Sequence, residues 1–572
     1  MGVRGLKTFF EREKLVRPIE TSVEINKWRE EHPGQKPILV IDFYNLCFSL
    51  TANIHDSVCG GDDQKSSNSL RKILSTLKDA GCSLVFFMDL NVQEGKIDEW
   101  LSRRNAEFQS NIILYDRIGL LPLSELFDTD EGAVLGSTLN ALKAIAKTYG
   151  EFHYSSRYEC DLETAQYATQ NNALAILSSD TDFLIFDGPW KNWSIHDLHF
   201  YRTNEIRTIE FDRNGLAKVC SLSRYQLPLF ATLLGNDFTK KYEDQLEKFY
   251  NSLGPFKYRI RNVAAYARKV GSEYLSDLDI RRLSQHVFGK ADKKIQQVIR
   301  DSLDSYNIDI PSATIDDPLE EKLLNTDMYE PYTYLMGTIL DIILDCYDMR
   351  GCKPEANYPL LIADWYKRNV GILRQRNNDS EFTFTILMKK SIDVGYKAYT
   401  ETPIYPNFSV PCLDDLYLQI DSVDNMEIRW KILAFIMSLS ENTISAIKIL
   451  PTAFRLISTT LFALVKHGLI QEIEADGILH TEYMNSTNDI KDVDYPTVLV
   501  ASHIRAAHLY KSAHSHIQLN FAIAGLLSFI KENLQFKGLY FQYIMSKIIK
   551  MNATERESFF APIKTYRIYS SD

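Results

Sequence analysis

The sequence predicts an α/β fold in its first half and a mostly helical second half. Three apolar runs, at residues 38–41, 84–88 and 173–177, lack the alternation of polar and apolar residues that is typical of a strand with one face exposed to solvent. Such runs are typical of strands in a buried parallel sheet. Helical patterns over residues 69–80 and 162–172 lie between them. Strands that alternate with helices in this way indicate a sheet flanked by helices.

The strand pattern fades after Asp237, and helical segments rich in Lys and Arg follow it. An acidic stretch that contains Pro311 and Pro318 is the best candidate for a boundary. We therefore predict an α/β domain over residues 1–300, a linker over residues 301–330 and a helical domain over residues 331–572.

Composition indicates a folded protein from a reducing compartment. Of 572 residues, 45% are hydrophobic and 24% are charged, and the eight cysteines form no CxxC pair. The longest uncharged apolar stretch, about fourteen residues near 517–530, predicts a core helix and no membrane association. A net charge of −11 argues against indiscriminate nucleic-acid binding. Carboxylates gathered in one metal site would account for part of that charge.

Carboxylates follow each of the three predicted strands. Asp42 ends the first strand, Asp89 ends the second, and Asp180 and Asp182 follow the third. Sites in open parallel sheets form beyond the carboxyl ends of strands. Each acid alone could be a helix cap, and Asp161 could cap the helix after it. Crowded carboxylates destabilise a fold unless cations neutralise them, so the whole set predicts a metal site. Oxygen ligands favour Mg²⁺ or Mn²⁺ over zinc.

Two other segments are expected to be ordinary. The histidines at 503, 508, 514 and 516 have no Cys or carboxylate at a spacing that would complete a zinc site. Residues 60–63, Gly-Gly-Asp-Asp, are too short for a phosphate loop, and we expect a mobile surface loop there.

Six blocks, in one order, resemble the flap endonuclease (XPG-type) nucleases, which have a PIN-like core. The blocks are the N-terminal MGVRGL, the strand ending at Asp42, Met88-Asp89, Glu159-Cys160-Asp161, Ser179-Asp180-Thr181-Asp182 and Leu234-Gly235-Asn236-Asp237-Phe238. They cover roughly residues 1–240. The N-terminal start, the ECD and SDTDF variants and the long helical second half look most like the asteroid branch. The resemblance implies a PIN-like parallel sheet flanked by helices.

The resemblance also implies a two-metal site. Two Mg²⁺ or Mn²⁺ ions would be held by seven carboxylates, with Asp42, Asp89, Glu159 and Asp161 at one ion and Asp180, Asp182 and Asp237 at the other. Lys96 and Arg103 stand where these nucleases carry a catalytic basic pair; a solvated helix face is the alternative. The residues assigned to nucleic-acid binding are Gly2, Phe48, Lys240, Lys241, Lys257, Arg259 and Arg261. For Phe48 a core role is an equal alternative.

The activity implied is structure-selective endonuclease cleavage of flap, overhang or splayed DNA, in the nucleus and in DNA repair, with the cytoplasm as the alternative location. Two departures bear on the substrate. Residues 251–269 lack the GxG turn with which the family's helix-hairpin-helix grips duplex DNA, and the arch region contains acidic residues 124–131. The alternatives are a nuclease-derived scaffold that binds protein partners through its C-terminal half, and a nuclease that acts on RNA.

Overall fold

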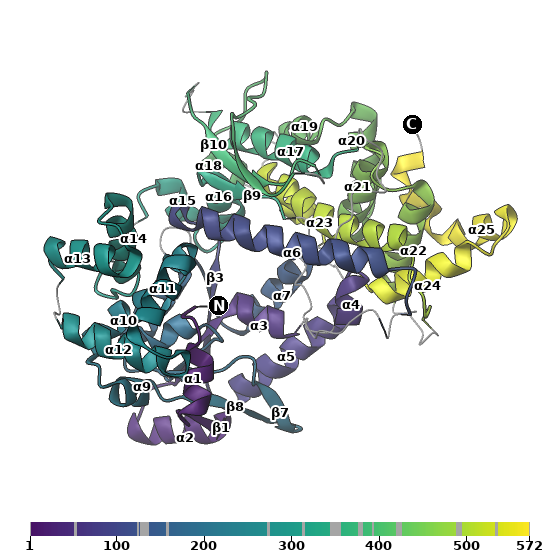
Figure 1. The fold of residues 1–572 in the computed structure, drawn as a ribbon. Helices are drawn as coiled ribbons and strands as arrows, with labels where there is room; N and C mark the ends of the chain where they lie inside the picture. Colours follow the sequence, from purple (N-terminus) through teal and green to yellow (C-terminus); the bar gives the residue numbers. More distant parts are fainter. Residues whose placement is uncertain are drawn as a thin grey trace. The chain divides into compact units, whose positions relative to one another are not determined.

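The computed structural model describes residues 2–50, 54–122, 125, 136–155, 159–271, 275–311, 315–343, 356–375, 381–391, 394–418, 426–487, 495–531 and 536–570. The chain forms two compact units (Figure 1). The first comprises residues 1–49, 71–99 and 146–313, and the second comprises residues 50–70, 100–145 and 314–572.

The first unit is built on an eight-stranded sheet. Its strands are β1 Val16–Glu20, β2 Ile38–Asp42, β3 Ser83–Asp89, β4 Glu151–Ser155, β5 Ala175–Leu177, β6 Lys191–Trp193, β7 His199–Arg202 and β8 Glu205–Phe211. The order is β1-β8-β6-β5-β2-β3-β4, and β7 pairs with β8. Strands β6, β5, β2, β3 and β4 run parallel, whereas β8 pairs antiparallel with β1, β6 and β7. The three predicted strands are the central ones, β2, β3 and β5.

Both faces of the central strands are buried, which explains why their sequences do not alternate with polar residues. Val40 and Val85 belong to a large core that also contains the buried residues of helix α8, Cys160–Gln170. On the opposite face, Phe86 packs against Phe43 and Phe152, with ring centroids 5.9 Å away in both cases. Successive residues of a strand point to opposite faces, so one run supplies both cores.

Helices surround this sheet. Those that lie within the first unit, or end at its edge, are α1 Leu6–Arg12, α2 Thr21–Glu31, α3 Phe43–Leu50, α8, α9 Arg213–Cys220, α10 Leu227–Leu234, α11 Glu243–Leu253, α12 Arg259–Val270, α13 Asp277–Phe288 and α14 Lys293–Asp304. Short 3-10 turns are η1 Glu94–Lys96, η3 Thr181–Leu184, η4 Arg224–Gln226, η5 Lys240–Tyr242 and η6 Phe256–Tyr258. Helix α8 packs on β2, β3 and β5, and α10 packs on α12 and α14. The α/β class predicted for this half is confirmed.

The second unit is mostly helical, as predicted, and also holds a three-stranded sheet that the sequence did not indicate. Its strands, in the order β11-β10-β9, are β9 Ile339–Asp341, β10 Phe384–Met388 and β11 Lys397–Glu401. Its helices are α4 Ile54–Val58, α15 Pro318–Leu323, α16 Tyr329–Met336, α17 Tyr358–Leu373, α18 Leu413–Leu418, α19 Met426–Met437, α20 Glu441–Ile449, α21 Thr452–Lys466, α22 Glu472–Ser486, α23 Ala501–Ile523, α24 Gly538–Ile548 and α25 Ala553–Phe560. Its 3-10 turns with described bounds are η10 Leu527–Phe529, η11 Ala561–Tyr566 and η12 Ile568–Ser570.

The residue boundaries of the two units differ from those of the predicted domains. Helices α5 Asp63–Asp79, α6 Ile97–Arg117 and α7 Gly136–Tyr149 each have residues in both units. The predicted linker, residues 301–330, contains the change of unit at 313/314 as well as α15, the end of α14 and the start of α16. The acidic stretch 124–131 lies outside the described residues except for Glu125.

Residues 60–63 are buried or half-buried within the second unit, so the expected surface loop is wrong. Asp63 begins α5 with a side chain that is 0% exposed, and it forms an ion pair with Lys511 of α23. Thr138 donates a hydrogen bond to the other Asp63 oxygen at 2.6 Å. Gly60 has φ +101°, and a Cβ there would lie 3.0 Å from the Cβ of Ala507. The glycine is therefore needed for close approach to α23.

Among the described residues, no single helix is long and apolar enough to cross a membrane. The bent pair α19 and α20 meets the length and hydropathy limits when both helices are counted together.

Candidate metal centre

Acidic residues follow three adjacent strands at one edge of the first unit's sheet. Asp42 ends β2, Asp89 ends β3, and Asp180 comes three residues after β5. Strand β2 lies between β3 and β5, and all three are parallel. The chain therefore changes the direction in which it adds strands next to β2, and ligands bind at such a switch point in open α/β sheets.

Asp161, Asp180 and Asp182 form the cluster at the centre of this site. Each offers a carboxylate oxygen, and the three oxygens lie within 4.8 Å of one another. In the described part of the chain, no other group of three or more His, Cys, Asp or Glu residues meets this spacing. Asp180 caps η3 by accepting a hydrogen bond from the backbone N–H of Asp182 at 3.0 Å, which fixes the two acids together.

Burial and mutual repulsion act on these carboxyls. Desolvation, followed by the negative charge of Asp180, raises the pKa values of Asp161 and Asp182 well above the usual range. A divalent cation would remove this repulsion, because it neutralises the charges that the protein places together.

Asp42 is held by two neighbours. Its Oδ1 accepts a hydrogen bond from the backbone N–H of Asn45 at 3.2 Å, and its Oδ2 accepts from Ser178 Oγ at 2.8 Å. The Asn45 side chain also donates to Oδ2. Burial raises the pKa of Asp42, although these hydrogen bonds oppose the rise. Ser178 Oγ accepts from the Asp180 N–H at 3.0 Å, so one serine joins the β2 and β5 acids.

Asp89 is accessible to water at the end of β3. Desolvation by the surrounding protein raises its pKa to about 7, with Lys96 opposing and Glu159 and Asp42 adding to the rise. A carboxyl with such a pKa is only partly ionised at neutral pH unless a cation is bound to it.

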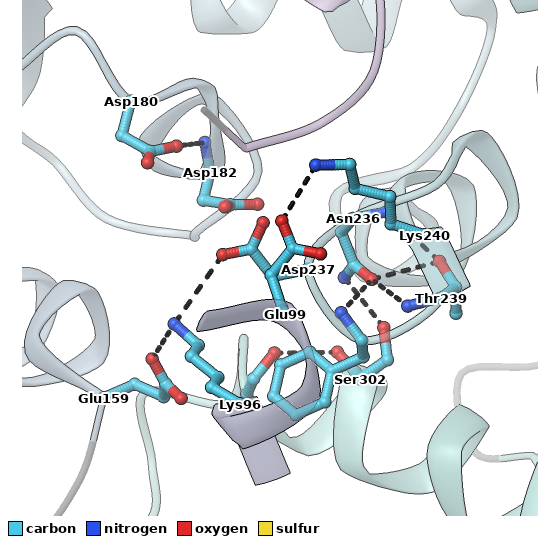
Figure 2. A network of polar contacts seen from close by, with 12 residues as sticks. Lys96, Glu99, Glu159, Asp180, Asp182, Asn236, Asp237, Thr239, Lys240 and Ser302 are labelled. Atoms are coloured by element: carbon cyan, nitrogen blue, oxygen red, sulfur yellow. Dashed lines mark hydrogen bonds and ion pairs between the residues drawn. The ribbon is translucent and has the colours of Figure 1, made fainter. Parts of the chain in front are cut away.

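Lys96 lies among the acids (Figure 2). Its Nζ forms an ion pair with Glu159 and lies 3.9 Å from Asp237 Oδ2. Burial alone would lower the pKa of Lys96, but the charges of Glu159 and Asp237 raise it above its ordinary value. Lys96, Glu159, Asp161, Asp182 and Asp237 also line a small cavity of about 20 Å³, enough for about one water molecule.

A buried hydrogen-bond network, which no sequence pattern indicated, supports this side of the site. The hydroxyl of Tyr306 donates to Asp182 and accepts from Asn236 Nδ2 at 3.2 Å. Asn236 Nδ2 also donates to Ser302 Oγ at 2.8 Å, and the Thr239 hydroxyl donates to Asn236 Oδ1 at 3.2 Å (Figure 2). The network fixes the loop that carries Asp237. Asn236 could have been suspected because it stands beside Asp237; Ser302 and Tyr306 lie some 65–70 residues later.

Gly2 lies directly against the acids. It has φ +80°, and a Cβ there would lie 2.2 Å from Asp180 Oδ1 and 2.6 Å from Thr181 Oγ1. Arg4 N–H donates to the carbonyl of Gly235 at 3.0 Å, so the N-terminal segment also contacts the Asp237 loop. Only glycine permits this approach without displacing Asp180.

The other predicted site residues differ from one another in burial and in their ion pairs. Phe48 is half-buried on α3, and Arg103 lies on the part of α6 that belongs to the second unit. Lys240 forms an ion pair with Glu99 at 2.8 Å, Arg259 with Glu247 at 2.9 Å and Arg261 with Glu13 at 2.6 Å. Lys241 and Lys257 are exposed. The assignment of the seven acids and of these basic residues to metal and nucleic acid stays a prediction.

The donor set fits a hard divalent cation. Asp161, Asp180 and Asp182 supply oxygen ligands within 4.8 Å of one another, and burial together with the charge of Asp180 raises the pKa values of Asp161 and Asp182. Carboxylate oxygens are the ligands that Mg²⁺ and Mn²⁺ prefer.

The buried histidines of α23 lie in the second unit; His508 Nε2, for example, hydrogen-bonds the carbonyl of Val58 at 2.8 Å.

Comparisons with known proteins give two kinds of relative. A family model described as the FAM120A-like domain matches residues 220–310. The constitutive coactivator of peroxisome proliferator-activated receptor gamma from Mus musculus is 33% identical over 308 residues, which are 52% of this chain and 37% of that protein. The single-strand DNA endonuclease ASTE1 from Danio rerio is 25% identical over 258 residues, 42% of this chain and 33% of that protein. The chain thus spans about a third of these relatives.

Solved structures match this chain at low identity and low TM-score. The catalytic core of Rad2 in complex with DNA substrate covers 56% of this chain and 93% of its own, at 16% identity and a TM-score of 0.31. The eukaryotic junction-resolving enzyme GEN-1 covers 70% and 95%, at 12% identity and a TM-score of 0.32. The expected place in the asteroid branch is not confirmed, because the coactivators match this chain at higher identity than ASTE1 does.

Proposed function

We propose that the first unit is a divalent-metal-dependent phosphodiesterase that cleaves nucleic acid with single-stranded ends or junctions. The observation that carries the proposal is the cluster of Asp161, Asp180 and Asp182, whose carboxylate oxygens lie within 4.8 Å of one another. A protein that served purely as a scaffold would gain nothing from crowded acids, which reduce its stability. The likeness to the ASTE1 endonuclease and the sequence blocks of flap nucleases support the same activity.

The chain's own residues prepare the site for this chemistry. Bound divalent ions would supply Lewis acidity to the phosphodiester and lower the pKa of the attacking water. The seven acids would hold these ions, with Tyr306 and Ser178 orienting Asp182 and Asp42. Lys96, whose pKa the charges of Glu159 and Asp237 raise, would supply a positive charge to the scissile phosphate beside the acids.

A second candidate function is that of a coactivator that binds a protein partner, through the C-terminal half. The 33% identity to the coactivators favours it, and so do the ion pairs that occupy Lys240, Arg259 and Arg261. These pairs reduce the positive charge available to phosphates. The two functions predict different results in one assay.

The test is cleavage of labelled flap, overhang and splayed DNA, and of the same shapes in RNA, with Mg²⁺ or Mn²⁺. We expect metal-dependent cleavage by the full chain, its loss in Asp180→Asn, and normal cleavage in Asp187→Asn. Asp187 is a suitable control because its side chain is 58% exposed, pairs with Arg224 and is not part of the acidic cluster. Cleavage that persists in Asp180→Asn would overturn the proposal. A wild-type chain that cleaves none of these substrates would favour the coactivator.

A further inference from the structure

The turn between α11 and α12 exposes two aromatic rings. Phe256 is 76% exposed and Tyr258 is 48% exposed, and they stand in the 3-10 turn η6 that directly precedes α12. Phe256 is the most exposed aromatic residue in the described part of the chain, although burial of a ring normally stabilises a fold. The turn is ordered: the Tyr258 N–H donates to the Pro255 carbonyl at 2.9 Å.

Cationic side chains surround these rings. Residues 253–271 contain five Lys or Arg residues and no acidic residue, and of the five, Arg259 and Arg261 pair with Glu247 and Glu13 from outside this segment. The guanidinium of Arg259 lies 4.3 Å from the ring centroid of Phe256, and Lys257 Nζ lies 4.8 Å from that of Tyr258. Aromatic rings interleaved with cations in this way fit a ligand that has flat, polarisable faces joined by negative charges.

Ion pairs tie the turn to the loop of the candidate metal centre within the same unit. Arg259 pairs with Glu247 at 2.9 Å, and Glu247 pairs with Arg4 at 3.0 Å. The Arg4 N–H in turn donates to the Gly235 carbonyl, two residues before Asp237. The guanidinium of Arg259 also lies 4.5 Å from the ring centroid of Tyr250. Arg259 therefore contacts Glu247 and Tyr250 as well as Phe256. The turn that carries Phe256 and Tyr258 is therefore linked to the loop of Asp237, one of the acids of the candidate metal centre.

We propose that the Phe256–Tyr258 turn is a stacking platform for single-stranded nucleic acid. Unpaired bases present open faces to an aromatic ring, whereas bases in a duplex are stacked on one another. The segment is also poorly suited to grip a duplex through its backbone, because Pro255 has no N–H to donate. The inference deepens the proposed nuclease function and rests on it for the class of ligand, but it concerns binding and needs no cleavage.

The test is fluorescence anisotropy of a labelled oligothymidylate, and in parallel of an oligouridylate, with the full chain in EDTA so that cleavage cannot occur. We expect Phe256→Ala and Tyr258→Ala each to weaken binding, by about fivefold to about 150-fold for the loss of one stacked base. Phe256→Trp should keep the affinity. Tyr225→Ala is the matched control, since Tyr225 is also 48% exposed in the first unit and should show wild-type binding.

The outcomes separate this inference from the nuclease proposal. Loss of binding in the two variants, with normal binding in Tyr225→Ala, supports the platform even if no cleavage is found. Unchanged affinity in Phe256→Ala and Tyr258→Ala would overturn it, as would a loss of the same size in Tyr225→Ala. Tighter binding of a duplex than of either single strand would also overturn it. Circular dichroism of each variant shows whether a loss of affinity reflects misfolding.

Discussion

The hydroxyl of Tyr306 donates a hydrogen bond to the carboxylate of Asp182, although the two residues lie 124 positions apart in the chain. The bond favours the ionised form of Asp182, against burial and the charge of Asp180. We therefore predict that Tyr306→Phe lowers Mn²⁺ affinity about 10- to 100-fold, as loss of a group that orients a metal ligand does. Calorimetric titration measures this. Tyr266→Phe, which removes a hydrogen bond to His286 elsewhere, should bind Mn²⁺ normally; equal affinity in both variants would contradict the role given to Tyr306.

Gly2 offers a sharper steric test. A methyl group at Gly2 would meet Asp180 Oδ1 at 2.2 Å, so Gly2→Ala must displace that acid, and we predict weaker Mn²⁺ binding and slower cleavage. Gly5→Ala is the matched control. Gly5 has φ +70°, close to the +80° of Gly2, but the nearest contact of an added Cβ is Ile260 at 3.9 Å. Both variants bear a similar backbone strain of about 1–2 kcal/mol, so an equal loss of metal binding would show that strain, and not the contact with Asp180, is responsible.

The raised pKa values predict a defined dependence on pH. Desolvation raises the pKa of Asp89 to about 7, so the folded chain binds this proton more tightly than the unfolded chain does. Without metal, this group therefore lowers the stability as the pH rises from about 4 to about 7. Divalent cations bind the deprotonated form, so the rise in Tm on adding Mn²⁺ should be larger near pH 8 than near pH 6. Differential scanning fluorimetry measures both effects. Asp89→Asn should reduce the difference, and a larger Mn²⁺ effect near pH 6 would contradict the assignment.

The ion pair of Asp63 and Lys511 predicts a stability effect in the second unit. Their side chains are 0% and 1% exposed, and Lys511 also donates to Thr138 at 3.1 Å. Lys511→Ala leaves a buried carboxylate without its cation and should reduce the free energy of unfolding by about 3–5 kcal/mol. Lys65→Ala breaks an exposed pair with Asp56 and should cost less than about 1 kcal/mol. Urea unfolding compares them; similar losses would show that the buried pair is not a structural link.

The sequence predicted those parts of the site that depend on local pattern. Asp42, Asp89 and Asp180 follow apolar runs, and parallel strands bring their carboxyl ends to one edge, so the sequence alone is enough to infer that these acids lie close together. Asp161 was open to a second reading as a helix cap. The helix in fact begins at Cys160, and Asp161 lies in its first turn with its carboxylate in the acidic cluster.

Interactions over long sequence separations could not be predicted in this way. Tyr306 lies in a turn after α14, within the predicted linker, and no spacing relates it to Asp182. Asp63 follows two glycines and was expected in a surface loop, because nothing nearby indicates that Lys511 pairs with it 448 residues later. The residue boundaries of the units could not be predicted for the same reason, since residues 50–70 and 100–145 belong to one unit with residues 314–572. The residue pattern within a segment predicts the secondary structure of that segment. It does not predict which residues far away in the sequence the segment contacts.

The clustered acids are expected to bind divalent cations, and Mn²⁺ titration followed by electron paramagnetic resonance measures this binding. Free Mn²⁺ gives a sharp six-line signal that broadens on binding, so the number of bound ions and their affinity follow from one titration. We predict saturable Mn²⁺ binding by the full chain that is lost in the double variant Asp161→Asn, Asp182→Asn and retained in Asp187→Asn. Equal binding by the wild type and the double variant, or no saturable binding by the wild type, would contradict the account.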